Sequence, residues 1–220
     1  MSRHSSGSAI TIQRVLPREF GRLALASEAI DADGRIGDVH SAYGDDRSPA
    51  LRWTAVPEAE SFALIVEDPD APLDRPGLHW AIWNIPGAFD ALPSSIRNAP
   101  FIDEFGGMVQ GKNLHGRYGY MGPKPPADDG PHRYHFQLFA LDRRLGLAPS
   151  APLEDLVREL KGSTIASAEL VGTYERVQDL TAPAAGEGRS FAGGDRGGLD
   201  EDDVDQHAPH DEDGVVRPGA

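Results

Sequence analysis

Two short acidic and histidine-bearing segments of this 220-residue chain could do chemistry together. The apolar run 62–66 leads directly into the segment 68–72 (DPDAP), and a second apolar run, 78–85, carries His79 near its start. If both runs are strands that pair, the acids and His79 meet at one rim of a sheet. The two prolines fix φ and restrict the residues before them, so this acidic corner is stiff. An aspartate beside a histidine can orient an imidazole for anion binding or serve in general acid–base chemistry.

A third segment rich in apolar and aromatic residues, 132–141, adds another histidine and a tyrosine. It follows a long stretch dense in glycine and proline, which predicts a structured loop rather than a helix or an interior strand. Side chains alternate along a strand, so His132 and Tyr134 share one face, and Arg133 and His135 share the other. His132 and Tyr134 can therefore address one pocket, while Arg133 is expected to hold the neighbouring loop through charge-assisted bonds.

The composition excludes several classes of function. Lysine and arginine number 21 and aspartate and glutamate 35, which gives a formal net charge of −14 at pH 7. This balance lacks the basic face that nucleic-acid binding needs, and it opposes attachment to anionic membranes. The absence of cysteine excludes disulfides, thiolate catalysis and cysteine-type zinc sites. With neither a signal-peptide core nor an apolar stretch of spanning length, we expect a cytoplasmic protein without integral membrane association.

The chain divides into three parts by composition. Residues 1–19 are expected to form a flexible leader and residues 20–182 a single domain dominated by strands. Within the domain, the apolar spacing over 152–162 predicts one helix, and 165–174 reads as a final strand. Residues 183–220 combine repeated glycine with an acidic cluster and few large apolar side chains, so they predict a disordered acidic tail.

Several of these segments together resemble the phosphatidylethanolamine-binding protein family, also called Raf kinase inhibitor-like, and look most similar to its bacterial branch. The motifs that carry the resemblance are DPDAP (68–72), HW (79–80), GPKPP (122–126) and GPHRY (130–134), with SPALRW (48–53) and AELVGTY (168–174) in support. The resemblance covers about residues 20–178. It implies a mostly β fold: an antiparallel β-sandwich with few short helices.

The resemblance also implies a small pocket for phosphate-like anions. Carried over residue by residue, the ligand-binding residues would be Asp68, Pro72, His79, Gly122, His132 and Tyr134. One departure concerns the pocket wall: where mammalian members carry a Trp-His-His run, this chain has Gly77-Leu78-His79. An aromatic wall is therefore absent or supplied elsewhere.

A bare carboxylate repels a phosphate, so Asp68 needs an indirect role. We predict that Asp68 accepts a hydrogen bond from one imidazole, which fixes the tautomer and raises the proton affinity of that ring. His79 and His132 would then donate to the anion, with Tyr134 and backbone N–H groups near Gly122 completing the shell. Binding would be weak and would tighten as pH falls through the imidazole range, at about 6.5.

Three classes of function stay open from the sequence. The first is a binding protein for a phosphorylated small molecule, a phospholipid headgroup or a phosphorylated side chain. The second is a protein–protein regulator that inhibits a kinase or protease, as the family name implies. The third is a hydrolase using an Asp–His pair. The residues that could form a mononuclear metal site are the same ones that the anion-binding role explains, so we assign no metal, cofactor or catalytic residue. We expect a monomer or homodimer.

Overall fold

The computed structural model describes residues 9–17 and 23–176, and strands dominate this part of the chain. The predicted tail, 183–220, lies outside the described residues. The elements, in chain order, are α1 (Thr11–Arg14), β1 (Leu25–Ala26), the 3-10 helix η1 (Asp38–His40), β2 (Leu51–Trp53), β3 (Ser61–Asp68), β4 (Gly77–Pro86), β5 (Ala91–Leu92), β6 (Phe101–Ile102), the 3-10 helix η2 (Asp103–Phe105), β7 (Met108–Gln110), β8 (His132–Leu141), α2 (Leu153–Ser163) and β9 (Thr164–Tyr174).

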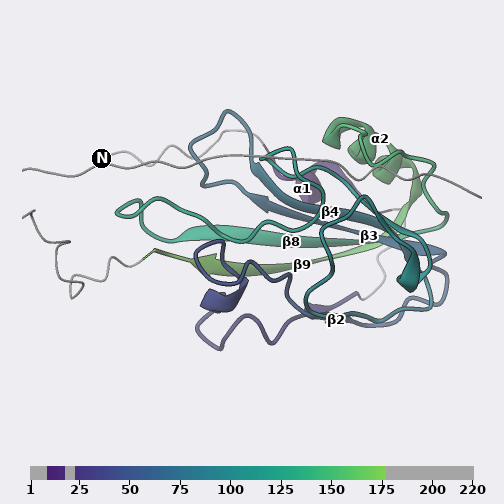
Figure 1. Cartoon of the computed structure of the whole chain (residues 1–220). Helices are drawn as coiled ribbons and strands as arrows, with labels where there is room; N and C mark the ends of the chain where they lie inside the picture. Colours follow the sequence, from purple (N-terminus) through teal and green to yellow (C-terminus); the bar gives the residue numbers. More distant parts are fainter. Residues whose placement is uncertain (1–8, 18–22, 177–220) are drawn as a thin grey trace, which may run out of the picture. The chain divides into compact units, whose positions relative to one another are not determined.

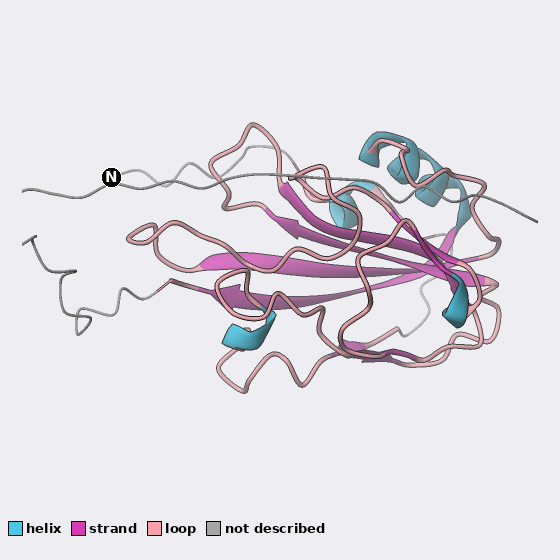
Figure 2. Ribbon diagram, in the orientation of Figure 1, coloured by secondary structure: helices cyan, strands magenta, loops and turns pink. Residues whose placement is uncertain are grey.

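Two sheets form the fold, and all pairs of these strands are antiparallel. The small sheet has the order β1-β2-β5, and the large sheet has the order β6-β7-β4-β3-β8-β9. Helix α2 lies on one side of the large sheet, and the small sheet lies on the other side (Figure 1). Figure 2 shows the same two layers of strands, joined by long loops. The predicted β-sandwich with few short helices is confirmed.

Strand β3 lies in the middle of the large sheet and is buried at every position. Phe62, Leu64 and Val66 belong to the core between the two sheets, whereas Ala63 and Ile65 belong to a second core on the helix side. A strand that is buried on both faces reads as an uninterrupted apolar run, and this is why the segment stands out in the sequence. Each fully buried Phe, Leu, Ile or Val side chain contributes about 1.5–3 kcal/mol to folding.

The beginning of the chain differs from the sequence prediction. The sequence predicts a flexible leader over residues 1–19, but residues 9–17 are described and include helix α1. Thr11 is fully buried, and Val15, at 1% exposure, belongs to the second core. The Thr11 N–H donates to the carboxylate of Glu67 on β3. The leader prediction is therefore wrong for residues 9–17. Glu67, which binds this segment, lies far along the chain, so no local sequence pattern indicates the contact.

The C-terminal part of the described chain agrees with the sequence patterns. Helix α2 begins at Leu153, directly after Pro152, and buries Leu156, Val157 and Leu160 against the second core. Proline is well placed before a helix because its missing N–H is one that the first turn cannot use. Strand β9 follows without a connecting loop and pairs along β8.

Candidate functional site

The end of β3 and the starts of β4 and β8 meet at one rim of the large sheet. Asp68, the last residue of β3, lies opposite Gly77, the first residue of β4. On the other side β3 pairs with β8, whose first residue is His132. Antiparallel pairing therefore brings Asp68, His79 and His132 together, as the order of the segments in the sequence predicts.

A β-bulge in β4 turns His79 toward this rim. Val66 pairs with Trp80, but Glu67 pairs with Leu78, so His79 is an extra residue on β4 without a partner on β3. Trp80 packs in the core between the sheets, while Leu78 packs against the second core on the opposite face. Strict alternation would place both on the same face; the bulge breaks this pattern and re-aims the side chain between them.

The bulge brings the His79 ring against the aromatic ring of a pocket residue. The centroids of His79 and Tyr134 are 5.0 Å apart, with the rings at 87°, in an edge-to-face arrangement. Tyr134 lies on the inter-sheet face of β8, where the alternation predicts it. This face therefore carries both rings beside the Asp68 carboxylate.

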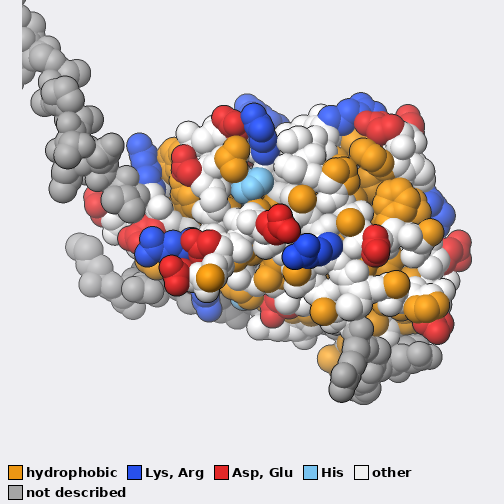
Figure 3. All heavy atoms as spheres, turned by 90° about the horizontal axis from the view of Figure 1, so that it is seen from below, with side chains coloured by type: hydrophobic (Ala, Val, Ile, Leu, Met, Phe, Trp, Pro, Cys, Tyr) orange, Lys and Arg blue, Asp and Glu red, His pale blue; other side chains and the backbone are white. Residues whose placement is uncertain are grey.

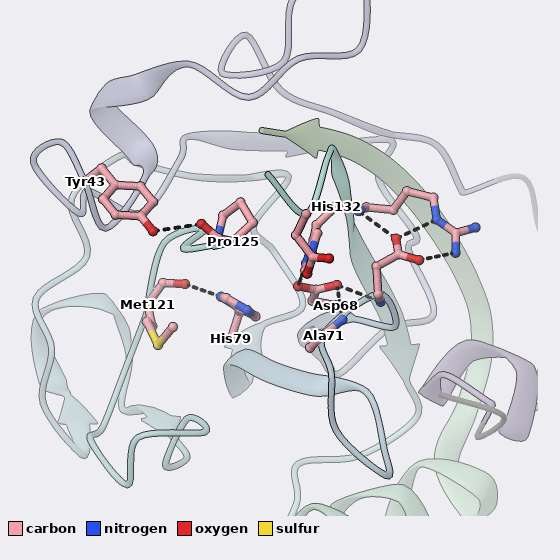
Figure 4. Close-up of polar contacts among 10 residues, drawn as sticks. Tyr43, Asp68, Ala71, His79, Met121, Pro125 and His132 are labelled. Atoms are coloured by element: carbon pink, nitrogen blue, oxygen red, sulfur yellow. Dashed lines mark hydrogen bonds and ion pairs between the residues drawn. The ribbon is translucent and has the colours of Figure 1, made fainter. Parts of the chain in front are cut away.

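The central contact of the site is a buried pair of Asp68 and His132 (Figure 4). The Nδ1 atom of His132 lies 2.8 Å from Oδ2 of Asp68, and both side chains are 4% exposed. The hydrogen bond with Asp68 is the main cause that raises the pKa of His132 above its usual value of 6.5. Asp68 therefore orients the imidazole and favours its charged form.

Asp68 is itself fixed by the backbone that follows it. Its Oδ1 accepts hydrogen bonds from the N–H groups of Asp70 and Ala71, at 2.8 and 3.1 Å. Asp70 in turn binds Arg133 through both carboxylate oxygens, at 2.7 and 2.8 Å. Arg133 thus holds the acidic loop from the opposite face of β8 through charge-assisted bonds. Pro72 lies beyond this turn and is exposed.

His79 differs in charge from His132. Its Nδ1 lies 2.9 Å from the carbonyl oxygen of Met121 and so carries the hydrogen of this bond. Burial is the largest cause that lowers the pKa of His79, which favours the neutral ring. The neutral ring then has a lone pair on Nε2. The sequence predicts that His79 donates to a ligand, and in the structure its Nδ1 hydrogen is bonded to Met121.

Tyr134 remains a neutral phenol. Burial, and then the charge of Asp68, raise the pKa of Tyr134 far above its usual value of 10. Its side chain is almost fully buried beside His79. Tyr134 thus provides the site with an aromatic wall as well as a hydroxyl group.

The glycine- and proline-rich loop 122–126 packs on a distant segment of the chain. The Gly122 N–H donates to Oδ1 of Asp46 at 2.6 Å, so this donor is already used within the protein. A side chain at Gly122 would meet the carbonyl oxygen of His40 at 2.2 Å, so the loop needs glycine to approach this closely. The Tyr43 hydroxyl donates to the carbonyl oxygen of Pro125 at 2.8 Å (Figure 4). The loop is therefore a fixed wall of the site, and its Gly122 N–H is not available to a ligand.

One polar residue of the site is missing from the sequence prediction. Asp129, in the turn before β8, lies with its Oδ2 3.2 Å from Nε2 of His132. The only sequence signal is a spacing of three residues between them, which by itself does not reveal a contact. Both nitrogens of His132 thus face a carboxylate.

One further cavity and one face of the described chain have a different lining. A cavity of about 440 Å³ lies on the small sheet and is lined by Ala24, Ala26, Arg52, Trp53, Thr54, Asp90 and Ala91. On the face seen in Figure 3, acidic and basic side chains are interspersed among hydrophobic ones. Within residues 9–17 and 23–176, no three His, Asp or Glu side chains are grouped so as to hold a metal ion. No helix of these residues is long and apolar enough to cross a membrane.

The fold and the site define a class of protein: a two-sheet antiparallel β protein with a buried Asp–His pair where β3 ends. The comparisons with known proteins specify this class further. The family model described as phosphatidylethanolamine-binding protein matches residues 26–175. This chain therefore belongs to the phosphatidylethanolamine-binding protein family, as the sequence motifs indicate.

Relatives with this likeness occur in archaea and bacteria. A UPF0098 protein of Methanothermobacter thermautotrophicus is 42% identical over 153 residues, which cover 69% of this chain and 98% of the relative. YbcL from Escherichia coli, a solved structure, is 31% identical to this chain, with a TM-score of 0.64. The match covers 71% of this chain and 100% of the YbcL chain. The family homologue CT736 from Chlamydia trachomatis is 35% identical, with coverages of 70% and 98% and a TM-score of 0.62.

Proposed function

We propose that this protein binds phosphate-like anions at the rim where β3 ends, with His132 as the principal donor. The observation that carries the proposal is the buried pair of Asp68 and His132. Asp68 accepts a hydrogen bond from the Nδ1–H of His132, and the Nε2 atom of the charged ring carries the other hydrogen. A buried imidazolium is a strong donor for an anionic oxygen, and the Nε2–H of His132 faces the partly exposed carboxylate of Asp129 at 3.2 Å.

His79 would give the site a second, different polar contact. Its Nδ1 hydrogen is used by Met121, so Nε2 of the neutral ring accepts a hydrogen bond. Figure 4 shows this second ring nitrogen of His79 on the side that faces Asp68. A donor at His132 and an acceptor at His79 suit a phosphate that carries both an anionic oxygen and a P–OH group. The proposed ligand form is therefore a monoprotonated phosphate group.

The experiment is a phosphorus and proton NMR titration of the full chain with inorganic phosphate, phosphoethanolamine and a phosphoserine peptide. We expect the His132 and His79 imidazole signals to shift in the wild type, and the shift and the binding to vanish in His132→Ala. His135→Ala is the matched control, because His135 lies on the opposite face of the same strand and pairs with Glu169. Binding that survives His132→Ala, or no shift at millimolar phosphate, would exclude the proposed site.

The three ligands separate the sources of the phosphate group. Equal affinity for all three would place recognition in the phosphate itself, and a preference for one would show which substituent the rim recognises. Inhibition of a kinase or protease remains the alternative that the family name implies, and the cytoplasmic location and the choice between monomer and homodimer remain predictions from the sequence.

A further inference from the structure

The proposed anion donor of this site is already in contact with an oxygen of the protein. Nε2 of His132 lies 3.2 Å from Oδ2 of Asp129, a carboxylate only three residues earlier in the chain. The other nitrogen of the ring, Nδ1, is held by Asp68 at 2.8 Å. An anionic oxygen therefore stands where the N–H of His132 would meet a phosphate oxygen.

The two carboxylates that face His132 differ in how firmly they are held. The side chain of Asp68 is 4% exposed, whereas the side chain of Asp129 is 47% exposed. The backbone N–H groups of Asp70 and Ala71 bind Asp68, so this carboxylate cannot leave without breaking the turn. An ion pair as exposed as that of Asp129 is worth little in water and can be replaced.

The turn that carries Asp129 leaves room for its side chain to move. Its neighbours Asp128 and Gly130 have φ angles of 71° and 79°, so the chain turns sharply on both sides of Asp129. The Asp129 side chain is itself 47% exposed, so it can rotate into solvent without disturbing a packed core.

The other titratable groups near the His132 ring are paired elsewhere, neutral or exposed. Arg133, the next residue on β8, has its guanidinium on Asp70. His79 and Tyr134 are favoured in their neutral forms by burial. Lys124 is exposed on the loop. His132 is therefore the charged donor of the site, and Asp129 is the carboxylate that an incoming anion meets there.

We infer that Asp129 is an internal competitor that occupies the anion-binding N–H of His132 and must be displaced for a ligand to bind. This inference rests on the proposed function. It adds that Asp129 lowers the affinity for every anion. After displacement the Asp129 carboxylate remains near the ligand, so its charge continues to oppose binding.

The test compares Asp129→Asn with the matched control Asp128→Asn in the full chain. Both variants remove one negative charge from the same turn, and asparagine tolerates the positive φ of residue 128. We expect Asp129→Asn to bind inorganic phosphate about three- to fivefold more tightly, the size of an exposed ion pair, while Asp128→Asn changes the affinity less than twofold. Acetate, which carries less charge than phosphate, should gain less from Asp129→Asn than phosphate does.

A second measurement tests the contact without any ligand. Asp129 is among the groups that raise the pKa of His132, so the imidazole pKa read by proton NMR should fall in Asp129→Asn and stay in Asp128→Asn. If the wild type binds phosphate and Asp129→Asn binds it no better, the competitor role is overturned while the anion site stands. An unchanged His132 pKa in Asp129→Asn would overturn it too. If no variant binds phosphate, the proposed function itself fails.

Discussion

Glu67 and Asp68 are neighbours at the end of β3, but their carboxylates lie on opposite faces of the large sheet and bind partners of different chemistry. Asp68 binds His132, whose charge changes with pH. Glu67 accepts hydrogen bonds from the Thr11 N–H and from the side-chain amide of Gln137, both at 2.7 Å. Neither of these donors titrates.

Burial does not distinguish the two carboxylates, because Glu67 is 2% exposed and Asp68 is 3% exposed. The difference lies in what each one holds. Asp68 orients a ring that has a second nitrogen at the rim, so its pair can respond to protons. Glu67 fixes the start of α1 to the sheet and has only structural partners. The chemistry of the partner, rather than burial, thus distinguishes the two acids.

The largest expected effect is on the structural side of this comparison. Glu67→Ala leaves the Thr11 N–H and the Gln137 amide without their acceptor, so we expect the free energy of unfolding to fall by about 2–4 kcal/mol. Urea unfolding followed by circular dichroism measures this loss. Glu67→Gln is the control, because it keeps an acceptor oxygen and should lose less. The phosphate affinity should change less than twofold; a large fall would show that the two faces are coupled.

A smaller, pH-dependent effect is expected on the site side. Because Asp68 raises the pKa of His132, this pair adds stability that is fully present below about pH 6.5 and is lost as pH rises through the raised pKa. Asp68→Asn should therefore lower the free energy of unfolding by about 1–2 kcal/mol near pH 6 and by less at pH 9. Urea unfolding at both pH values measures the difference. A loss of unfolding free energy in Asp68→Asn that is the same at both pH values would contradict a charged Asp68–His132 pair.

The smallest effect is expected from Arg133. Its pair with Asp70 is partly exposed, with the two side chains at 51% and 23%, so Arg133→Gln should cost about 0.5 kcal/mol or less. The bond to Arg133 lowers the pKa of Asp70, so this contribution is present at neutral pH and is lost as pH falls through the lowered value. Urea midpoints and a phosphate titration check both points. A tenfold loss of phosphate affinity in Arg133→Gln would show that Arg133 contributes directly to phosphate binding.

Much of the fold could be predicted from local patterns. The runs that form β3, β4 and β8 are apolar because these strands are buried on both faces, and α2 follows the helical period. The pairing of Asp68 with an imidazole could also be predicted, because the family resemblance implies that Asp68 and His132 share one pocket. His132 and Tyr134 lie on the inter-sheet face because side chains alternate along β8.

The rest depends on contacts that a local pattern does not contain. The bond from Thr11 to Glu67 spans 56 residues, and the bond from Gly122 to Asp46 spans 76. The bulge at His79 is a property of how two strands pair, so neither strand alone reveals it. Proton positions also depend on these partners, and for this reason the sequence does not reveal that the Nδ1 hydrogen of His79 is bonded to Met121.

The docked helix α1 places the N-terminal boundary of the folding unit earlier than the family match. That match begins at residue 26, whereas Val15 already packs in the second core and Arg14 forms an ion pair with Glu154 of α2. A fragment cut to residues 26–175 would uncover apolar surface on the large sheet and strip the buried carboxylate of Glu67 of its Thr11 donor. The smallest fragment expected to keep the stability of the whole domain therefore begins before residue 10.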